Sequence, residues 1–247
     1  MDIAILNIVK TESLKMRHTF GKILSIIFPV FTLFLVYGLI GGRNFSAGVW
    51  NFWYTILLPA MLAVLCYLGM KKDEKINYYN MLVMPATPEK CLLGKMIYYS
   101  IELFLSNFII FIGTSVADIL NGNTIPIVGG LCAAVLLSIL YLWEIPLYML
   151  LSYRFGMFVD IFVCFTLSIG ATAILANTNL WWLCPAAVPV RLMCPILGIL
   201  PNGLLVPDGS SLYSTNVILP GIFVSLVWFV LMVYLVMHFF KGKAVEG

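Results

Sequence analysis

Uninterrupted apolar runs of about twenty residues recur along this sequence and limit what it can fold into. The cleanest run extends from Val217 to Phe240 without a full charge. A helix needs roughly 20 mostly apolar residues to cross a bilayer. Since 62% of the 247 residues are hydrophobic and only 10% are charged, a single water-soluble core could not hide them. We therefore expect an all-α integral membrane protein rather than a disordered chain or a cytosolic enzyme.

Six segments have the length and composition of membrane spans. They are Ile23–Ile40, Trp50–Met70, Met96–Leu120, Ile125–Leu151, Met157–Asn177 and Val217–Phe240. A further apolar stretch, 180–206, is interrupted by Pro185, Pro189, Arg191, Pro195 and Pro201. Proline costs about 3 kcal/mol in a helix interior, so we expect two short half-inserted helices there. This would be a re-entrant hairpin between spans five and six.

The basic residues predict the orientation of these spans. Of the 14 Lys and Arg residues, all except Arg43 and Arg191 lie on one side of the predicted spans. Positive residues favour the cytoplasmic side, so both termini and the N-terminal segment 1–22 are expected to be cytoplasmic. The net charge of +3 is too small to suggest a nucleic-acid partner.

The N-terminal segment contains a possible short helix, Ile3–Arg17, for which Asp2 could be the N-cap. Its apolar positions do not fall on one clean face. An interfacial helix and a cytosolic tail both remain compatible with this pattern.

The cytoplasmic segment 71–95 is the best candidate for a contact with another protein. A short helix at Asp73–Val83 should turn at Pro85, and Thr87-Pro88-Glu89 is typical of the start of the next helix. A displayed amphipathic helix suits docking, although a connecting loop on lipid headgroups fits equally well. The candidate coupling residues are Asp73, Glu74, Lys75, Tyr78, Met81, Leu82, Met84 and Pro85.

Glu144 is the most unusual charge inside a predicted span. It lies ten residues before Arg154, which places it roughly 15 Å deep at 1.5 Å per residue. An ionised acid there is costly, so it should face the bundle or a partner. Pro146 should kink the helix beside it. Trp143, Glu144 and Pro146 could form a substrate or gating site, or Glu144 could only lock helix packing; Glu102 and Asp160 are weaker candidates.

Several kinds of chemistry find no support in the sequence. There is no phosphate-binding loop or dinucleotide fingerprint, no nucleophile elbow and no zinc motif, so we expect no cofactor in this chain. The six cysteines fall mostly in apolar runs, where they are expected to act as small hydrophobic residues. Only Cys184 and Cys194, in the outer segment, could form a disulfide.

The chain resembles the ABC-2 type permeases, and more specifically the lantibiotic-immunity permeases of the E-subunit type, the MutE, EpiE and NisE group. The stretches that carry the resemblance are Asn51–Leu65 (NFWYTILLPAMLAVL), Trp143–Leu147 (WEIPL), Phe155–Phe158 (FGMF), Val188–Leu204 (VPVRLMCPILGILPNGL) and Ile218–Gly221 (ILPG). The resemblance covers essentially the whole chain. Glu144 departs from the Gln that is common in related permeases.

The resemblance implies a single transmembrane domain, 1–247, with six helices in the ABC-2 (type V exporter-like) arrangement. Its coupling helix would lie between spans two and three. Such a subunit expels lantibiotic peptides from the cell membrane of a Gram-positive bacterium. It would work with a second, G-type permease and two copies of an ATPase subunit that binds ATP and Mg²⁺.

In this reading the chain is not itself an enzyme, and the outer segment lines or covers the exit. The candidate residues of that segment are Arg191, Pro195, Pro201 and Asn202. The alternative, from the residues alone, is a proton-coupled secondary transporter that uses Glu144 or Asp160.

Overall fold

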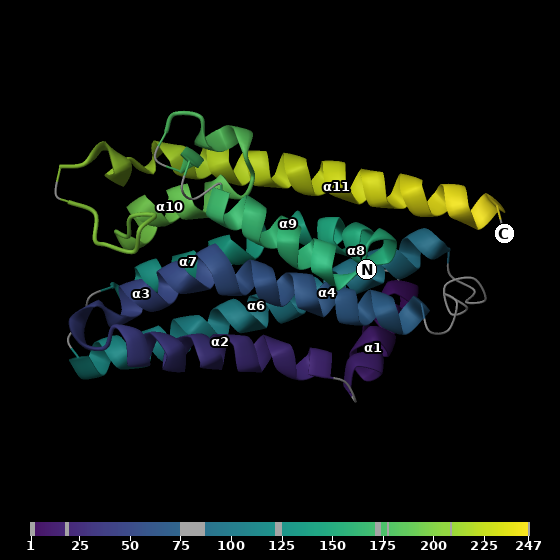
Figure 1. Ribbon diagram of the computed structural model, residues 1–247, viewed down its shortest axis with the longest axis horizontal. Helices are drawn as coiled ribbons and strands as arrows, with labels where there is room; N and C mark the ends of the chain where they lie inside the picture. Colours follow the sequence, from purple (N-terminus) through teal and green to yellow (C-terminus); the bar gives the residue numbers. More distant parts are fainter. Residues whose placement is uncertain are drawn as a thin grey trace.

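The computed structural model shows a bundle of helices that run roughly along one long axis (Figure 1). The structure describes residues 3–17, 20–74, 87–121, 125–170, 174–176, 178–207 and 209–246. Within these ranges no β-strand occurs, and Ile199 and Leu205 form one isolated β-bridge. The expected all-α class is confirmed.

The helices are α1 (Ile3–Arg17), α2 (Phe20–Leu39), α3 (Phe45–Phe52), α4 (Leu58–Glu74), α6 (Pro88–Asn121), α7 (Ile127–Leu140), α8 (Glu144–Arg154), α9 (Met157–Gly170), α10 (Ala187–Leu197) and α11 (Ile218–Glu246). A π-helical turn, Trp53–Leu57, joins α3 to α4. In Figure 1, α1 lies towards the same end of the bundle as the C-terminus, and α10 lies at the opposite end.

Among the residues that the structure describes, four helices are long and apolar enough to cross a membrane. They are Phe20–Leu39, Phe45–Glu74, Glu89–Leu120 and Thr215–Lys241, and they overlap predicted spans one, two, three and six. The pair α7 and α8 passes the same test when it is counted as one broken span. Four or five such helices are compatible with a multi-pass membrane protein.

The predicted fourth span is bent. α7 and α8 meet at an angle of 43° across a break at residues 141–143. Pro146 has no N–H to donate to the carbonyl oxygen of Leu142. The N–H of Ile145 donates to that oxygen instead, at 3.3 Å. The kink that Pro146 predicted beside Glu144 is confirmed.

The predicted fifth span is described only in part. Met157–Asn177 contains a described helix, α9, of only 14 residues. At 1.5 Å per residue this is about 21 Å, less than the roughly 30 Å of a bilayer core. Residues 171–173 and 177, which belong to the same predicted span, lie outside the described residues. The described part of α9 is shorter than a full span, and the predicted length of the fifth span stays a prediction.

The proline-rich stretch 180–206 forms one helix, α10, and not the two half-helices expected. Pro189 lies in the first turn of α10, where a missing N–H costs little, and Pro195 lies inside its last turn. Pro185 and Pro201 lie outside α10 and therefore do not interrupt its hydrogen bonds. α10 packs against α7 and α11, and residues 187–194 are all buried. The segment is therefore irregular chain plus a helix enclosed by other helices.

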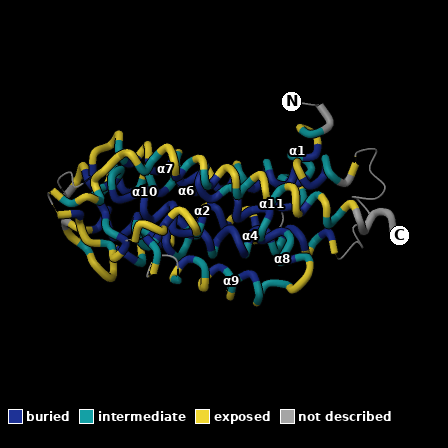
Figure 2. Tube along the Cα trace, turned by 90° about the horizontal axis from the view of Figure 1, so that it is seen from above, coloured by how far each residue is buried: buried dark blue, intermediate teal, exposed yellow. Residues whose placement is uncertain are grey.

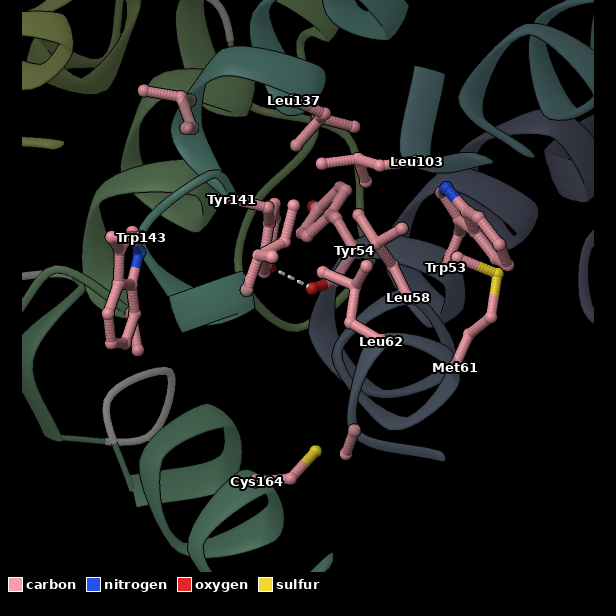
Figure 3. Close-up of a cluster of buried hydrophobic side chains, with 14 of the residues drawn as sticks. Trp53, Tyr54, Leu58, Met61, Leu62, Leu103, Leu137, Tyr141, Trp143 and Cys164 are labelled. Atoms are coloured by element: carbon pink, nitrogen blue, oxygen red, sulfur yellow. Dashed lines mark hydrogen bonds between the residues drawn. The ribbon is translucent and has the colours of Figure 1, made fainter. Parts of the chain in front are cut away.

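The centre of the bundle is α4, whose residues are buried over most of its length (Figure 2). Figure 3 shows how Trp53, Tyr54 and Tyr141 fill the space beside it, together with aliphatic side chains from α4, α6 and α7. The Tyr141 hydroxyl donates a hydrogen bond to the carbonyl oxygen of Tyr54. This bond fastens the break between α7 and α8 to the π-helical turn.

Candidate functional site

α1 packs against α6 through one face that contains Ile8, Glu12 and Met16. These residues are four apart, so they lie one above the other on the helix. Gly94 of α6 allows the close approach, because a Cβ at this position would lie 2.4 Å from Cγ2 of Ile8. The predicted helix Ile3–Arg17 is confirmed, and it is packed against the bundle. Its proposed cap, Asp2, lies outside the described residues.

Four charged side chains from α1, α4 and α6 form a closed ring of ion pairs, which we call the four-charge cluster. Its members are Glu12, Lys15, Asp73 and Lys95. The amine of Lys15 lies 2.7 Å from Glu12 Oε1 and 3.0 Å from Asp73 Oδ1. The amine of Lys95 lies 2.8 Å from Glu12 Oε2 and 2.5 Å from Asp73 Oδ2. Each lysine thus pairs with both carboxylates.

The four-charge cluster is largely withdrawn from water. The side chains of Asp73 and Lys95 are each 1% exposed, whereas Lys15 is 20% exposed at the edge. Burial lowers the pKa of Lys15, but the Glu12 and Asp73 carboxylates outweigh this and raise it above its ordinary value. Removing one partner from such a ring leaves an uncompensated buried charge. The cluster therefore makes the junction of α1, α4 and α6 dependent on all four residues.

The four-charge cluster includes residues from the helices on both sides of segment 75–86. Asp73 is in the last turn of α4, and Lys95 is in the second turn of α6. The Lys72 amine also donates a hydrogen bond to the carbonyl oxygen of Lys15. The helix before the segment and the helix after it are therefore joined to each other and to α1.

The predicted coupling residues are only partly visible in the structure. Asp73 is buried in the four-charge cluster, and Glu74 is exposed. The remaining six lie outside the described residues: Lys75, Tyr78, Met81, Leu82, Met84 and Pro85. The predicted helix start at Thr87-Pro88 is confirmed, since α6 begins at Pro88 and the Cys91 N–H donates to the Thr87 carbonyl at 3.2 Å.

Sequence reasoning missed Glu12, Lys15 and Lys95 as members of one site. The buried face of α1 was not recognised in the sequence because the charged Glu12 lies between Ile8 and Met16, so the face is not purely apolar. The local signal available was the i, i+3 spacing of Glu12 and Lys15. The contacts to Asp73 and Lys95 span 58 and 83 residues of sequence, and no local pattern records them.

Glu144 forms a second candidate site at the bend between α7 and α8. It is fully buried, and neither carboxyl oxygen has a hydrogen-bond partner among the described residues. The Tyr148 hydroxyl lies one turn further along α8. This hydroxyl and Trp143 Nε1 are also buried and have no hydrogen-bond partner among the described residues. α8 packs against α4, α9 and α11, and the Trp143 ring lies 6.4 Å from that of Trp228. The site thus holds unused donors and acceptors in an apolar wall.

The other two acids expected inside spans are hydrogen-bonded to serines. The Ser152 hydroxyl donates to Asp160 Oδ2 at 2.5 Å, between α8 and α9. The Ser25 hydroxyl donates to Glu102 Oε2 at 2.5 Å, between α2 and α6. Both acids are buried. Glu102 therefore contributes to helix packing, whereas Asp160 retains one oxygen without a hydrogen-bond partner among the described residues.

The candidate residues of the outer segment lie together at the end of the bundle that carries α10. Arg191 is buried and donates from Nη1 to the Leu212 carbonyl at 3.1 Å. Pro195 lies in α10, whereas Pro201 and Asn202 belong to the turn that follows it. Asn202 Oδ1 accepts from the Leu204 N–H at 3.1 Å. Cys184 and Cys194 are both free, so they form no disulfide.

The chain matches no known family profile, and no curated protein matches it significantly. No group of three or more His, Cys, Asp or Glu that could hold a metal ion occurs among the residues that the structure describes. The function must therefore be argued from the geometry and from the sequence resemblance.

Proposed function

We propose that this chain is the membrane-spanning subunit of a heteromeric ABC exporter that expels lantibiotic peptides from the membrane and so gives immunity or resistance. A separate ATPase subunit, in two copies, binds ATP and Mg²⁺ and performs the hydrolysis, and a related permease of the G type completes the complex. The observation that carries the proposal is the four-charge cluster. It joins the helices on both sides of segment 75–86, where the ATPase would dock.

The four-charge cluster suits the transmission of force from a docked subunit. Movement of segment 75–86 would act on Asp73 at the end of α4 and on Lys95 at the start of α6. Since these residues are bridged through Glu12 and Lys15, α1, α4 and α6 would move together. A flexible loop without such bridges would absorb the motion locally.

The membrane arrangement in this proposal is the six-span ABC-2 form, comparable to type V exporters. The spans would be α2, α3 with α4, α6, α7 with α8, α9 and α11. The four-charge cluster and both termini would be cytoplasmic in a Gram-positive cell, in keeping with the distribution of basic residues. The segment containing α10 would then lie at the outer exit.

The experiment that tests this proposal uses growth protection. A sensitive Gram-positive strain would express this chain with the G-type permease and the ATPase, and would be challenged with a panel of lantibiotics. We expect protection against at least one peptide, with loss of protection when this chain is omitted or the ATPase site is inactivated. Protection that persists with an inactive ATPase would contradict the proposal.

A second candidate function rests on the unpartnered carboxyl of Glu144. A buried acid inside a span is a common element of proton-coupled transport. Under this alternative, the purified chain alone would move a hydrophobic substrate in liposomes when a proton gradient is imposed. Substitution by Gln would abolish that movement, because an amide cannot release a proton. Movement by the isolated chain without an ATPase would favour this function over the exporter.

A further inference from the structure

A cavity of about 350 Å³ lies at the end of the bundle opposite the four-charge cluster. It is formed between the start of α3 and the turn that follows α10. Its lining residues are Ile40, Asn44, Ala47, Gly48, Asn51, Phe52, Asn202, Gly203, Leu204 and Leu205. The volume lies within the range of about 300–1,000 Å³ found for small-ligand sites. None of the lining residues carries a charge.

One wall of the cavity is held in place by Asn51 of α3. Its side-chain nitrogen donates to the carbonyl oxygens of Leu200 at 3.4 Å and Pro201 at 3.2 Å. Gly203 has a positive φ of 85°, and a Cβ there would lie 3.2 Å from Asn51 Oδ1. These contacts fix the turn against α3 before any ligand arrives. Binding to a preformed wall avoids much of the ordering cost.

The chemistry of the lining is that of an amide-rich, uncharged surface beside apolar side chains. Three carboxamides, from Asn44, Asn51 and Asn202, belong to the lining. The Asn51 nitrogen already donates to the turn, and Asn202 Oδ1 already accepts from the Leu204 N–H. The Asn44 carboxamide, Asn51 Oδ1 and the Asn202 nitrogen are left to complement the N–H and C=O of a peptide group. Leu204 and Leu205 are 62% and 50% exposed at the same place. A charged group would find no ionic partner among the lining residues, and burying it would be costly.

We propose that this cavity binds an uncharged segment of peptide that carries a bulky aliphatic or aromatic side chain. The carboxamides would pair with the backbone of the segment, and the apolar residues would cover its side chain. The peptide character of the occupant rests on the proposed export function. The site would contact substrate at the exit end of the bundle, at a distance from the four-charge cluster.

Asn44 is the position at which the site can be tested with least harm to the fold. It is exposed, and although it is the N-cap residue of α3, its side chain makes no capping hydrogen bond. Asn44→Trp would fill part of the cavity, and Asn44→Ala would remove one carboxamide. The matched control is Leu219→Trp, because Leu219 of α11 is 79% exposed and does not line the cavity.

The probe is the tetrapeptide acetyl-Gly-Leu-Gly-Phe-amide with a diazirine analogue in place of Leu, added to the full chain in phosphatidylcholine liposomes. We expect photo-crosslinks within residues 40–52 and 202–205. Their yield should fall at least fivefold in Asn44→Trp, about threefold in Asn44→Ala, and remain unchanged in Leu219→Trp. The same peptide with Lys in place of Phe should compete at least fivefold more weakly than the unlabelled probe.

Crosslinks spread evenly over the lipid-facing helices, or unaffected by either Asn44 substitution in protein of unchanged melting temperature, would overturn the proposal. Displacement of the probe by dihexanoyl-phosphatidylcholine as effectively as by unlabelled peptide would do the same and assign the cavity to lipid. The outcome is separable from that of the growth experiment. Crosslinking needs no ATPase, so loss of protection with intact crosslinking would contradict only the export function.

Discussion

At the scale of single residues, Asp73 shows how strongly this chain depends on a few buried charges. It touches both lysines of the four-charge cluster and is itself 1% exposed. By contrast, the ion pair of Lys241 and Glu89 is 3.8 Å long, and its side chains are 73% and 44% exposed. Buried and exposed ion pairs respond very differently to the loss of one partner.

Asp73→Asn should therefore lower the free energy of unfolding by about 3–5 kcal/mol, because the buried Lys95 amine and the partly exposed Lys15 amine lose a shared carboxylate. Glu89→Gln is the matched control and should cost less than about 1 kcal/mol. Both values can be measured by mixed-micelle denaturation of the purified chain. Equal effects of the two substitutions would show that the ring of ion pairs in the four-charge cluster is not closed in the purified chain.

Lys15 gives the four-charge cluster a predicted dependence on pH. The carboxylates of Glu12 and Asp73 raise its pKa above the ordinary 10.5 despite partial burial. A lysine whose folded pKa is raised stabilises the fold below its unfolded pKa, and this stabilisation is lost as pH rises through the folded value. Lys15→Arg stays charged in this range. We expect the wild-type melting temperature to fall more steeply than that of Lys15→Arg above about pH 10.5; parallel curves would contradict this.

At the scale of elements, the bend between α7 and α8 positions Glu144. The bend of 43° coincides with a proline that cannot complete the helical hydrogen-bond pattern. It places Glu144 and Tyr148 in the apolar wall between α4, α9 and α11. If the site serves transport, substitutions of Glu144 and of Pro146 should show separately how the carboxyl group and the bend affect it.

Glu144→Gln should leave assembly and stability almost unchanged, because the carboxyl oxygens have no described hydrogen-bond partner to lose. It should alter lantibiotic protection at least fivefold if the carboxyl contacts substrate or gates its path. Pro146→Ala, which permits a straighter helix, should change protection as well. Growth inhibition and size-exclusion chromatography measure the two properties. Unaltered protection by Glu144→Gln would assign the residue to packing alone.

At the scale of the whole molecule, the sequence predicted the long elements better than their connections. The apolar runs located α2, α6 and α11, and Thr87-Pro88 located the start of α6. The start of α9 at Met157 agrees with the predicted fifth span, whose far end lies outside the described residues. The four-charge cluster was invisible because its contacts join residues far apart in the sequence. Apolar periodicity reports which face is buried, but it does not report which buried charges meet.

The most direct test of the account is whether an ATPase binds this chain through segment 75–86. The purified complex would carry Met81→Asp, Leu82→Asp or Met84→Asp, each of which places a charge on the expected docking surface. Glu89→Gln, just beyond the segment, is the control. We predict that the ATPase co-purifies with the control but at less than a tenth of that level with each Asp variant, while the permease stays monodisperse. Undiminished co-purification with all three Asp variants would contradict the central claim.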